Sequence, residues 1–429
     1  GTIIIEKLVL DPSNLIDPAE DLIFGYSGDL AGFDLNAKGD LFEAIVFDDV
    51  LPGDYQVTED DPSLEFFQLT DLDCDDPSNN SSVNAAPEVR RADITLDPGE
   101  TVTCRFVNTR LAQPGRLIVE KLTIGGVANF TYDIESISPD PISTPLNLNT
   151  DIANPISFEY PLVEAGTYNV VEQDPGPEWE LISVECGLGV DGNSGPDEGT
   201  FTSLGDRLAS VRIDDGEVVK CTFTNRKRGN IIVRKFTDPV GDPQIFEFNA
   251  NYGGFSLSDG GEHDSGPLDP GSYNVSEVVP EGWELLNTEC TSSNNDEETV
   301  DNIDLNPGET VTCDFYNQKD ANIIVRKFTD PVGDPQVFEF NANYGGFSLS
   351  HGGMNDSGDL DTGVYSVSEV VPDGWELINT ECSSTNNDEE SAASISLQAG
   401  ETVTCDFYNQ KDANIIVRKF TDPVGDPQV

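Results

Sequence analysis

A lysine, a glutamate and an asparagine recur at matching positions in four segments of the sequence. The lysine follows two apolar residues in strict alternation, as in Ile231-x-Val233-x-Lys235. Glu277 and Asn317 each end a similar alternating run. Because successive side chains of a strand point to opposite faces, each polar residue shares its face with apolar neighbours. We therefore expect all three side chains to point into the core of a sheet protein.

Burial would give such a trio its own chemistry. Desolvation lowers the pKa of a lysine and raises that of a glutamate. A neutral amine beside a carboxamide carbon is a nucleophile facing an electrophile, and a protonated glutamate can shuttle protons between them. The product would be a Lys–Asn isopeptide bond, formed once within the chain with loss of ammonia. The alternative is a buried Lys–Glu salt bridge with the asparagine as hydrogen-bond partner.

Each of the four segments carries one complete trio. The expected bonds join Lys7 to Asn108, Lys121 to Asn225, Lys235 to Asn317, and Lys327 to Asn409. The glutamates expected to promote them are Glu59, Glu172, Glu277 and Glu369. We expect no catalysis on other molecules, since the reaction would be intramolecular and would turn over once.

The lysines belong to a repeated sequence that divides the chain. Asn-Ile-Ile-Val-Arg-Lys-Phe-Thr-Asp-Pro-Val-Gly-Asp-Pro-Gln begins at Asn230, Asn322 and Asn414, and looser versions follow Thr2 and Arg116. A fixed interval of this size indicates an array of similar domains, each large enough for its own core. The predicted domains are repeat 1 (1–113), repeat 2 (114–228), repeat 3 (229–321), repeat 4 (322–413) and the opening strand of a fifth repeat (414–429).

That last segment contains Lys419 but no glutamate or asparagine of its own trio. One interpretation is that the chain is part of a longer array of repeats. The other is that the strand inserts into the sandwich of a neighbouring molecule, as in strand donation. Because repeat 1 already has its own opening strand, we favour the first interpretation.

The pattern of short alternating runs and turns predicts an all-β fold. Turn signals in repeat 3 come every eight to twelve residues, which is typical of a β-sandwich. No stretch has a helical period with caps. The strands predicted in repeat 3 lie near 230–236, 245–252, 254–258, 272–279, 283–290, 302–305 and 309–317. The fold class is thus a tandem array of Ig-like, seven-stranded β-sandwiches.

Eight cysteines fall two to a repeat, which favours one disulfide in each and an oxidising compartment. The expected pairs are Cys74–Cys104, Cys186–Cys221, Cys290–Cys313 and Cys382–Cys405. Free buried thiols and metal ligands are the alternatives. The absence of Cys-x-x-Cys spacing, with only two histidines, disfavours zinc.

The composition excludes several classes of function. The 429 residues include 80 acidic and 22 basic side chains, for a net charge of -58. Such a surface repels nucleic acid and anionic membranes, and no apolar run approaches the length of a membrane span. We expect no metal or other cofactor. The acidic segments 71–76 and 294–298 are candidates for Ca²⁺, against the interpretation that they are solvated loops.

The motifs resemble the collagen-adhesin B-type and SpaA-like prealbumin-fold repeats of microbial surface proteins and pilins. The resemblance rests on the opening lysine, Gly-x-Tyr-x-Val-x-Glu (271–277), Pro-x-Gly-Trp (280–283) and Gly-Glu-Thr-Val-Thr-Cys-x-Phe-x-Asn (308–317), and recurs in each repeat. It implies a prealbumin-like sandwich in which Lys and Asn form the isopeptide and Glu promotes it. Repeat 1 lacks the Gly-Trp, and paired cysteines are not general in the family.

These observations lead to three hypotheses of function. The first is a secreted or surface-displayed structural protein, a semi-rigid rod or filament serving as fibre, stalk or adhesin shaft, whose partners are neighbouring repeats and further copies. The second is an adhesin that binds an unidentified host or matrix ligand through the divergent repeats 1 and 2, which carry insertions such as 139–155. The third is a non-catalytic spacer of a larger secreted protein. Trp179, Trp283 and Trp375 are predicted to cap the cores.

Overall fold

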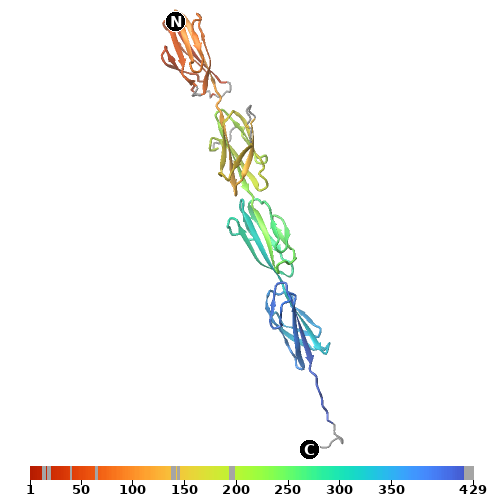
Figure 1. Cartoon of the computed structure of the whole chain (residues 1–429). Coiled ribbons are helices and arrows are strands. Elements are labelled where there is room, and N and C mark those ends of the chain that lie inside the picture. Colours follow the sequence, from red (N-terminus) through yellow and green to blue (C-terminus); the bar gives the residue numbers. More distant parts are fainter. Residues whose placement is uncertain are drawn as a thin grey trace. The chain divides into compact units, whose positions relative to one another are not determined.

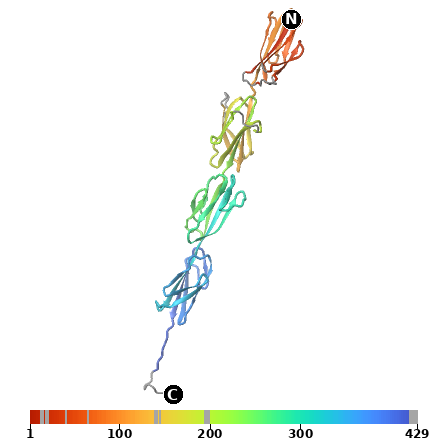
Figure 2. The same cartoon turned by 180° about the vertical axis from the view of Figure 1, so that it is seen from behind.

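The computed structural model describes residues 1–11, 16, 21–38, 41–62, 66–136, 142, 145–192 and 199–419. These residues form strands and turns without an α-helix, which confirms the all-β prediction (Figure 1, with the reverse side in Figure 2). Accordingly, this part of the chain has no helix long and apolar enough to cross a membrane.

The chain divides into two compact units. Unit 1 comprises Gly1–Thr123, Val127–Gly176 and Leu181–Asn225, and unit 2 comprises Ile124–Gly126, Pro177–Glu180 and Arg226–Val429. Unit 1 contains nearly all of repeats 1 and 2, and unit 2 contains repeats 3 and 4. The finer boundaries stay predictions, although every sheet described below takes its strands from one repeat.

Repeat 1 forms two sheets. The first has the order β4-β1-β9-β6, from β4 (Phe42–Phe47), β1 (Thr2–Leu10), β9 (Thr101–Arg110) and β6 (Phe67–Asp75). The second has the order β3-β2-β5-β8-β7, from β3 (Phe33–Asn36), β2 (Ile23–Gly28), β5 (Gly53–Glu59), β8 (Arg91–Leu96) and β7 (Ser82–Asn84).

Repeat 2 has the same two sheets. The first, β13-β10-β18-β15, consists of β13 (Ile156–Val163), β10 (Gly115–Ile124), β18 (Val218–Lys227) and β15 (Trp179–Leu188). The second, β12-β11-β14-β17-β16, consists of β12 (Pro145–Asn149), β11 (Asn129–Ser136), β14 (Gly166–Glu172), β17 (Leu208–Ile213) and β16 (Phe201–Ser203). Of the insertion 139–155, residues 139–141 and 143–144 lie outside the described residues.

Repeats 3 and 4 keep the first sheet and divide the second. The first sheet of repeat 3 consists of β22 (Glu262–Asp264), β19 (Asn230–Asp238), β27 (Thr310–Lys319) and β25 (Trp283–Ser292). A second sheet consists of β21 (Phe255–Leu257), β20 (Phe246–Ala250) and β24 (Val275–Val278). A third consists of β23 (Gly271–Tyr273) and β26 (Ile303–Leu305). Repeat 4 has the same three sheets. The first consists of β31 (Met354–Asp356), β28 (Asn322–Asp330), β36 (Thr402–Lys411) and β34 (Trp375–Ser384), and the second of β30 (Phe347–Ser350), β29 (Val337–Ala342) and β33 (Val367–Val370). The third consists of β32 (Gly363–Tyr365) and β35 (Ile395–Leu397).

The opening and closing strands of each repeat lie side by side at the centre of the first sheet. β1 runs parallel to β9, β19 to β27, and β28 to β36; β10 is likewise the neighbour of β18. Burial alternates along these strands, so that Ile3, Ile5, Lys7 and Val9 face inward from β1. The tryptophans predicted to cap the cores, Trp179, Trp283 and Trp375, are buried.

The strand count differs from the prediction of seven, since the described residues of repeat 3 form nine. Glu262–Asp264 forms β22, which was missed because its residues are all polar. The predicted strand 272–279 is interrupted at Asn274. There the main-chain N–H donates to Oδ1 of Asn251 (3.2 Å) and the C=O accepts from the N–H of Asn251 (3.4 Å), in place of the ladder partner.

The expected opening strand of a fifth repeat does not form over residues 414–419, and Ile415, Ile416 and Val417 are exposed. In repeat 4 the same sequence is paired on both sides, with β31 and β36. Residues 414–419 pair with no strand of the described structure. Residues 420–429 lie outside the described residues.

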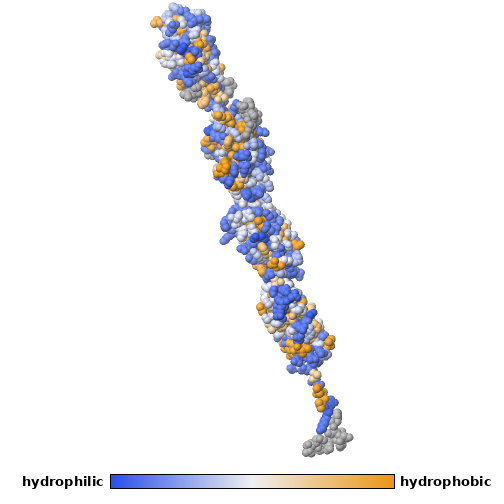
Figure 3. Space-filling view, in the orientation of Figure 1, coloured by the Kyte–Doolittle hydropathy of each residue, from blue (hydrophilic) through white to orange (hydrophobic). Residues whose placement is uncertain are grey.

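The described surface shown in Figure 3 is mainly hydrophilic, with apolar residues scattered singly or in small groups.

Candidate functional site

Three strands of each repeat place the lysine, glutamate and asparagine inside the sandwich. The opening strand carries the lysine and the closing strand carries the asparagine, while the glutamate comes from the second sheet. All four lysine side chains and all four glutamate side chains are 0 % exposed. The asparagines, Asn108, Asn225, Asn317 and Asn409, are buried as well.

The parallel register explains how lysine and asparagine meet. In repeat 3, Lys235 is opposite Phe315 of the closing strand, and Asn317 lies two residues further, opposite Thr237. The long lysine side chain spans this offset along the strand direction. Glu277 approaches from β24, where its antiparallel partner is Phe248 of β20.

In repeats 3 and 4 the lysine contacts the asparagine. The Lys235 ammonium donates to Oδ1 of Asn317 at 2.7 Å, and Glu277 lies 3.5 Å away. Lys327 likewise donates to Oδ1 of Asn409, with Glu369 at 3.2 Å. Within the described residues, neither glutamate receives a hydrogen bond from outside its own trio.

In repeat 2 the three side chains form a closed network. Lys121 donates to Oδ1 of Asn225 and to Oε2 of Glu172 (3.0 Å). The Asn225 amide donates to Oε1 of Glu172 at 2.8 Å. Two further donors, Tyr132 Oη at 3.2 Å and Arg207 Nη1 at 3.2 Å, also reach this carboxylate.

In repeat 1 the lysine contacts the glutamate instead. Lys7 donates to Oε1 of Glu59, and Tyr26 Oη is 3.4 Å from the same oxygen. Neither carboxamide atom of Asn108 has a hydrogen-bond partner in the described structure. The structure therefore brings lysine, glutamate and asparagine into contact in repeats 2, 3 and 4. In repeat 1 it shows the contact of Lys7 with Glu59, and Asn108 is buried.

An aromatic ring that was not predicted as part of the site lies against each lysine. The Nζ atoms lie 4.0–4.3 Å from the ring centroids of Phe24, Phe130, Phe246 and Phe338. These rings exclude water, although their faces also attract a cation. The signal in the sequence is Phe-x-Tyr or Phe-x-Phe on the strand that follows the opening strand of each repeat. We call this strand, which is β2, β11, β20 or β29, the second main strand.

Burial shifts the pKa values toward neutral groups. Desolvation is the largest effect and lowers the pKa of Lys7 and of Lys121 to about 8, although the neighbouring glutamate opposes it. It also lowers the pKa of Lys235 and of Lys327. Desolvation raises the pKa of Glu277 against the opposing charge of its lysine. In repeat 3 these shifts favour the neutral Lys235 amine and the protonated Glu277 that the reaction requires.

A disulfide joins the closing strand of each repeat to its neighbour. The pairs are those predicted, Cys74–Cys104, Cys186–Cys221, Cys290–Cys313 and Cys382–Cys405. In repeat 3, Cys290 and Cys313 are directly opposite in the ladder of β25 and β27. Cys313 and Asn317 both face inward from β27, so each closing strand can carry two covalent links.

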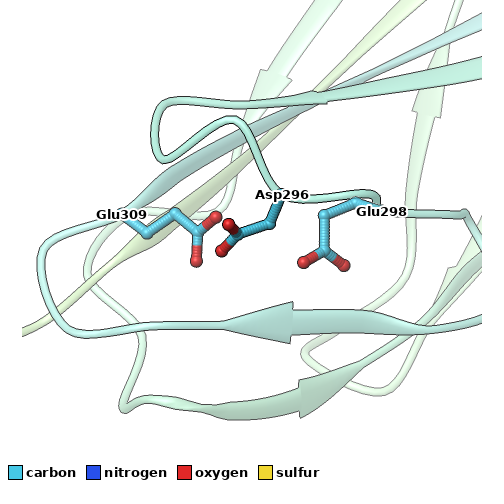
Figure 4. A group of neighbouring side chains, drawn as sticks. All are labelled: Asp296, Glu298 and Glu309. Atoms are coloured by element: carbon cyan, nitrogen blue, oxygen red, sulfur yellow. The ribbon is translucent and has the colours of Figure 1, made fainter.

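The two acidic segments behave differently. In residues 71–76, the Asp76 carboxylate accepts main-chain hydrogen bonds from Ser78 (2.9 Å) and Ser81 (2.7 Å), and the described residues show no group of three candidate ligands there. Asp296 and Glu298 of the second segment do lie beside a third carboxylate, Glu309 (Figure 4).

The Glu309 carboxylate was not predicted as part of any site. It accepts a hydrogen bond from the Ser292 hydroxyl and another from the Asn306 N–H (2.6 Å). These bonds close the turn before β27. Repeat 4 has the same arrangement with Asp388, Glu390 and Glu401, and calcium binding at either group stays a hypothesis.

Several known proteins are similar to this chain. Among solved structures, the chain is similar to the Bacillus anthracis TIE protein (14% identity, 91% of this chain and 69% of that chain, TM-score 0.30). It is also similar to the Streptococcus pyogenes major pilin (15%, 48% and 99%, 0.21) and to two B repeat units of the Staphylococcus aureus collagen binding protein (12%, 96% and 99%, 0.16). The search of curated proteins finds no match.

A family model described as a prealbumin-like fold domain matches residues 117–227. The matched range runs from the opening strand of repeat 2, which carries Lys121, to the closing strand, which carries Asn225. This match confirms, over residues 117–227, the resemblance seen in the sequence.

Proposed function

We propose that the chain is an extracellular structural protein, a fibre, stalk or adhesin shaft, whose sandwiches are each closed by a self-formed Lys–Asn isopeptide bond and a disulfide. The observation that carries the proposal is the buried contact between Nζ of Lys235 and Oδ1 of Asn317, beside Glu277. Disulfides in all four repeats support an oxidising, extracellular setting.

The bond-forming step needs only groups that are present. A proton passes from the Lys235 ammonium to Glu277, and the neutral Nζ attacks Cγ of Asn317. Glu277 then returns the proton to Nδ2 and takes up a second proton from the attacking Nζ, so that the glutamate ends the reaction protonated. The Cγ–Nδ2 bond breaks, ammonia leaves, and an Nζ–Cγ amide remains. No oxidant or cofactor enters this balance. Because the Lys235 amine and the Asn317 carboxamide are consumed, the reaction occurs once within the chain.

The position of the link gives it a mechanical purpose. Tension on a repeat enters at the start of the opening strand and leaves at the end of the closing strand, and these strands are adjacent and parallel. A bond from Lys235 to Asn317 carries the tension directly from one to the other. The residues between them are then protected from extension, which suits a load-bearing or protease-exposed protein.

The test is peptide mapping of the complete oxidised chain. Digestion should yield one branched peptide containing Lys235 and Asn317, lighter by one ammonia than its two parts, and equivalent peptides from the other repeats. The Lys235→Ala chain should lack the branched peptide of repeat 3 alone. Recovery of only linear, unmodified peptides from the unaltered chain would overturn the proposal.

A further inference from the structure

One position beside the glutamate separates the four repeats into two pairs. On the second main strand, the residue directly opposite the glutamate is Tyr26 in repeat 1 and Tyr132 in repeat 2. In repeats 3 and 4 it is Phe248 and Phe340. The four residues thus occupy one structural position but differ by a hydroxyl group.

The rings themselves are placed alike. Tyr26 packs edge-on against Phe106 of the closing strand with centroids 5.2 Å apart, and Tyr132 packs against Phe223 at 5.1 Å. Phe248 and Phe340 make the same edge-on contact with their closing strands, each at 5.1 Å. Exchange of tyrosine and phenylalanine here therefore changes the hydrogen bonding while the packing is kept.

The hydroxyl donates to the glutamate. Tyr26 Oη is 3.4 Å from Oε1 of Glu59, and Tyr132 Oη is 3.2 Å from Oε2 of Glu172. Burial and the neighbouring carboxylate raise the pKa of Tyr132 well above its ordinary value, so its hydroxyl remains a donor. Arg207 supplies Glu172 with one more donor.

Repeats 3 and 4 lack this donor. Within the described residues, no tyrosine or arginine donates to Glu277 or Glu369, whose near neighbours are the lysine and asparagine of their own trios. A hydrogen bond to a carboxylate favours its charged form, and its absence favours the protonated acid. The proposed reaction needs a protonated glutamate beside a neutral lysine. This neutral pair and the ion pair hold the same number of protons, and they differ only in which side chain carries the shared proton. The hydroxyl therefore shifts the equilibrium from the neutral pair toward the unreactive ion pair, at any pH where the two side chains share that proton.

We propose that Tyr26 and Tyr132 are positioning residues whose hydroxyls stabilise the Lys7–Glu59 and Lys121–Glu172 ion pairs, so that the isopeptide bonds of repeats 1 and 2 form more slowly than those of repeats 3 and 4. This inference rests on the proposed function and deepens it. The lysine contact of repeat 1 agrees, because Lys7 donates to Glu59 and Asn108 has no hydrogen-bond partner in the described structure. In repeat 2, Lys121 donates to Glu172 and to Asn225, so there the proposal rests on the donors to Glu172. The isopeptide bonds of repeats 3 and 4, which have phenylalanine at this position, would thus form first.

The test uses the full chain made in an oxidising cell-free system and quenched at successive times, with the four branched peptides quantified by mass spectrometry. The branched peptides of repeats 3 and 4 should appear before those of repeats 1 and 2. Tyr132→Phe should accelerate bond formation in repeat 2 by about tenfold or more, since hydrogen bonds to charged groups are the stronger class. Phe248→Tyr should slow repeat 3 by a similar factor.

Tyr168→Phe is the matched control, because the Tyr168 hydroxyl donates to the main-chain oxygen of Glu164 and the ring belongs to the same repeat. It should leave the rate unchanged. Opposite effects of Tyr132→Phe and Phe248→Tyr cannot come from structural damage, which would slow both. Unchanged rates, or changes of the same sign, with bonds present would overturn this inference alone. Absence of every branched peptide from the unaltered chain would overturn the proposed function and this inference with it.

Discussion

The Nζ atom of Lys235 lies 2.7 Å from Oδ1 of Asn317, although 82 residues separate the two along the chain. Both side chains are buried, and the opening and closing strands that carry them are neighbours in one sheet. A covalent bond at this contact would enclose nearly the whole of repeat 3 in a single loop.

Lys235→Ala should destabilise repeat 3 strongly. Loss of a cross-link around a loop of this size is expected to cost about 4 kcal/mol of unfolding free energy. The measurement is hydrogen exchange or calorimetry on the full chain, with the transition of repeat 3 resolved. Lys319→Ala is the control, since Lys319 is 40 % exposed and lies outside the trio. It pairs with Asp242 and lies 5.6 Å from the Trp283 ring, and a partly exposed salt bridge contributes about 1 kcal/mol or less. Equal losses from the two variants would contradict the cross-link.

Glu277→Gln should prevent the bond while leaving the pocket filled. Glutamine matches the volume of glutamate, but it cannot accept a proton from the amine and return it to the leaving group. The branched peptide of repeat 3 should disappear, although Lys235 and Asn317 are unchanged. The exposed Glu262, replaced in the same way, should have no effect. A branched peptide from the Glu277→Gln chain at the original yield would exclude a proton-shuttling role.

The burial of the lysines, glutamates and asparagines could be predicted because the clue was local. A lysine in alternation with Ile231 and Val233 must share their inward face, and the same argument applies to Glu277 and Asn317. The repetition of the trio within one chain made the three strands comparable without any other sequence. The cysteine pairs were predictable for the same reason.

Other features depend on contacts between strands and could not be predicted. β22 consists of polar residues and is defined by pairing with β19. The break at Asn274 depends on Asn251, which is distant in sequence. The tyrosine hydroxyls reach the glutamates only through the register of two antiparallel strands, and the identical opening sequence after Asn414 forms no strand over 414–419.

The unlinked lysine should make stability depend on pH. Asn225→Ala removes the electrophile and leaves Lys121 as an amine whose folded pKa is about 8, below the value of about 10.4 in an unfolded chain. Between these values the unfolded state binds more protons, so the free energy of unfolding rises with pH, by up to about 3 kcal/mol in total.

The measurement is chemical denaturation of the full chain between pH 7 and pH 10.5, following repeat 2. The unaltered chain serves as the control, because an amide nitrogen does not titrate in this range. Its profile should lack the added rise seen in Asn225→Ala. Parallel profiles for the two chains would mean that Lys121 titrates in both, or in neither.

Salt should stabilise the protein. The net charge is -58, and the cations of repeats 3 and 4 already have acidic partners: Arg234–Asp314, Lys235–Glu277, Lys319–Asp242, Arg326–Asp406, Lys327–Glu369 and Lys411–Asp334. The remaining carboxylates repel one another, and screening shortens the range of this repulsion from about 10 Å at 0.1 M to about 3 Å at 1 M.

Melting temperatures should therefore rise by several degrees between low salt and 1 M NaCl. NaCl and CaCl₂ at equal ionic strength should act alike if screening is the only cause. A specific excess with calcium that Glu298→Gln abolishes would instead identify the acidic group of Asp296, Glu298 and Glu309 as a cation site. A fall in melting temperature with NaCl would contradict the repulsion argument.

The most direct test of the account is the intact mass of the fully matured chain after complete reduction of its disulfides. Formation of the four isopeptide bonds predicts a mass below that of the sequence by one ammonia molecule per repeat. A reduced chain with the full mass of its sequence would show that the buried lysines, glutamates and asparagines form only hydrogen bonds and ion pairs.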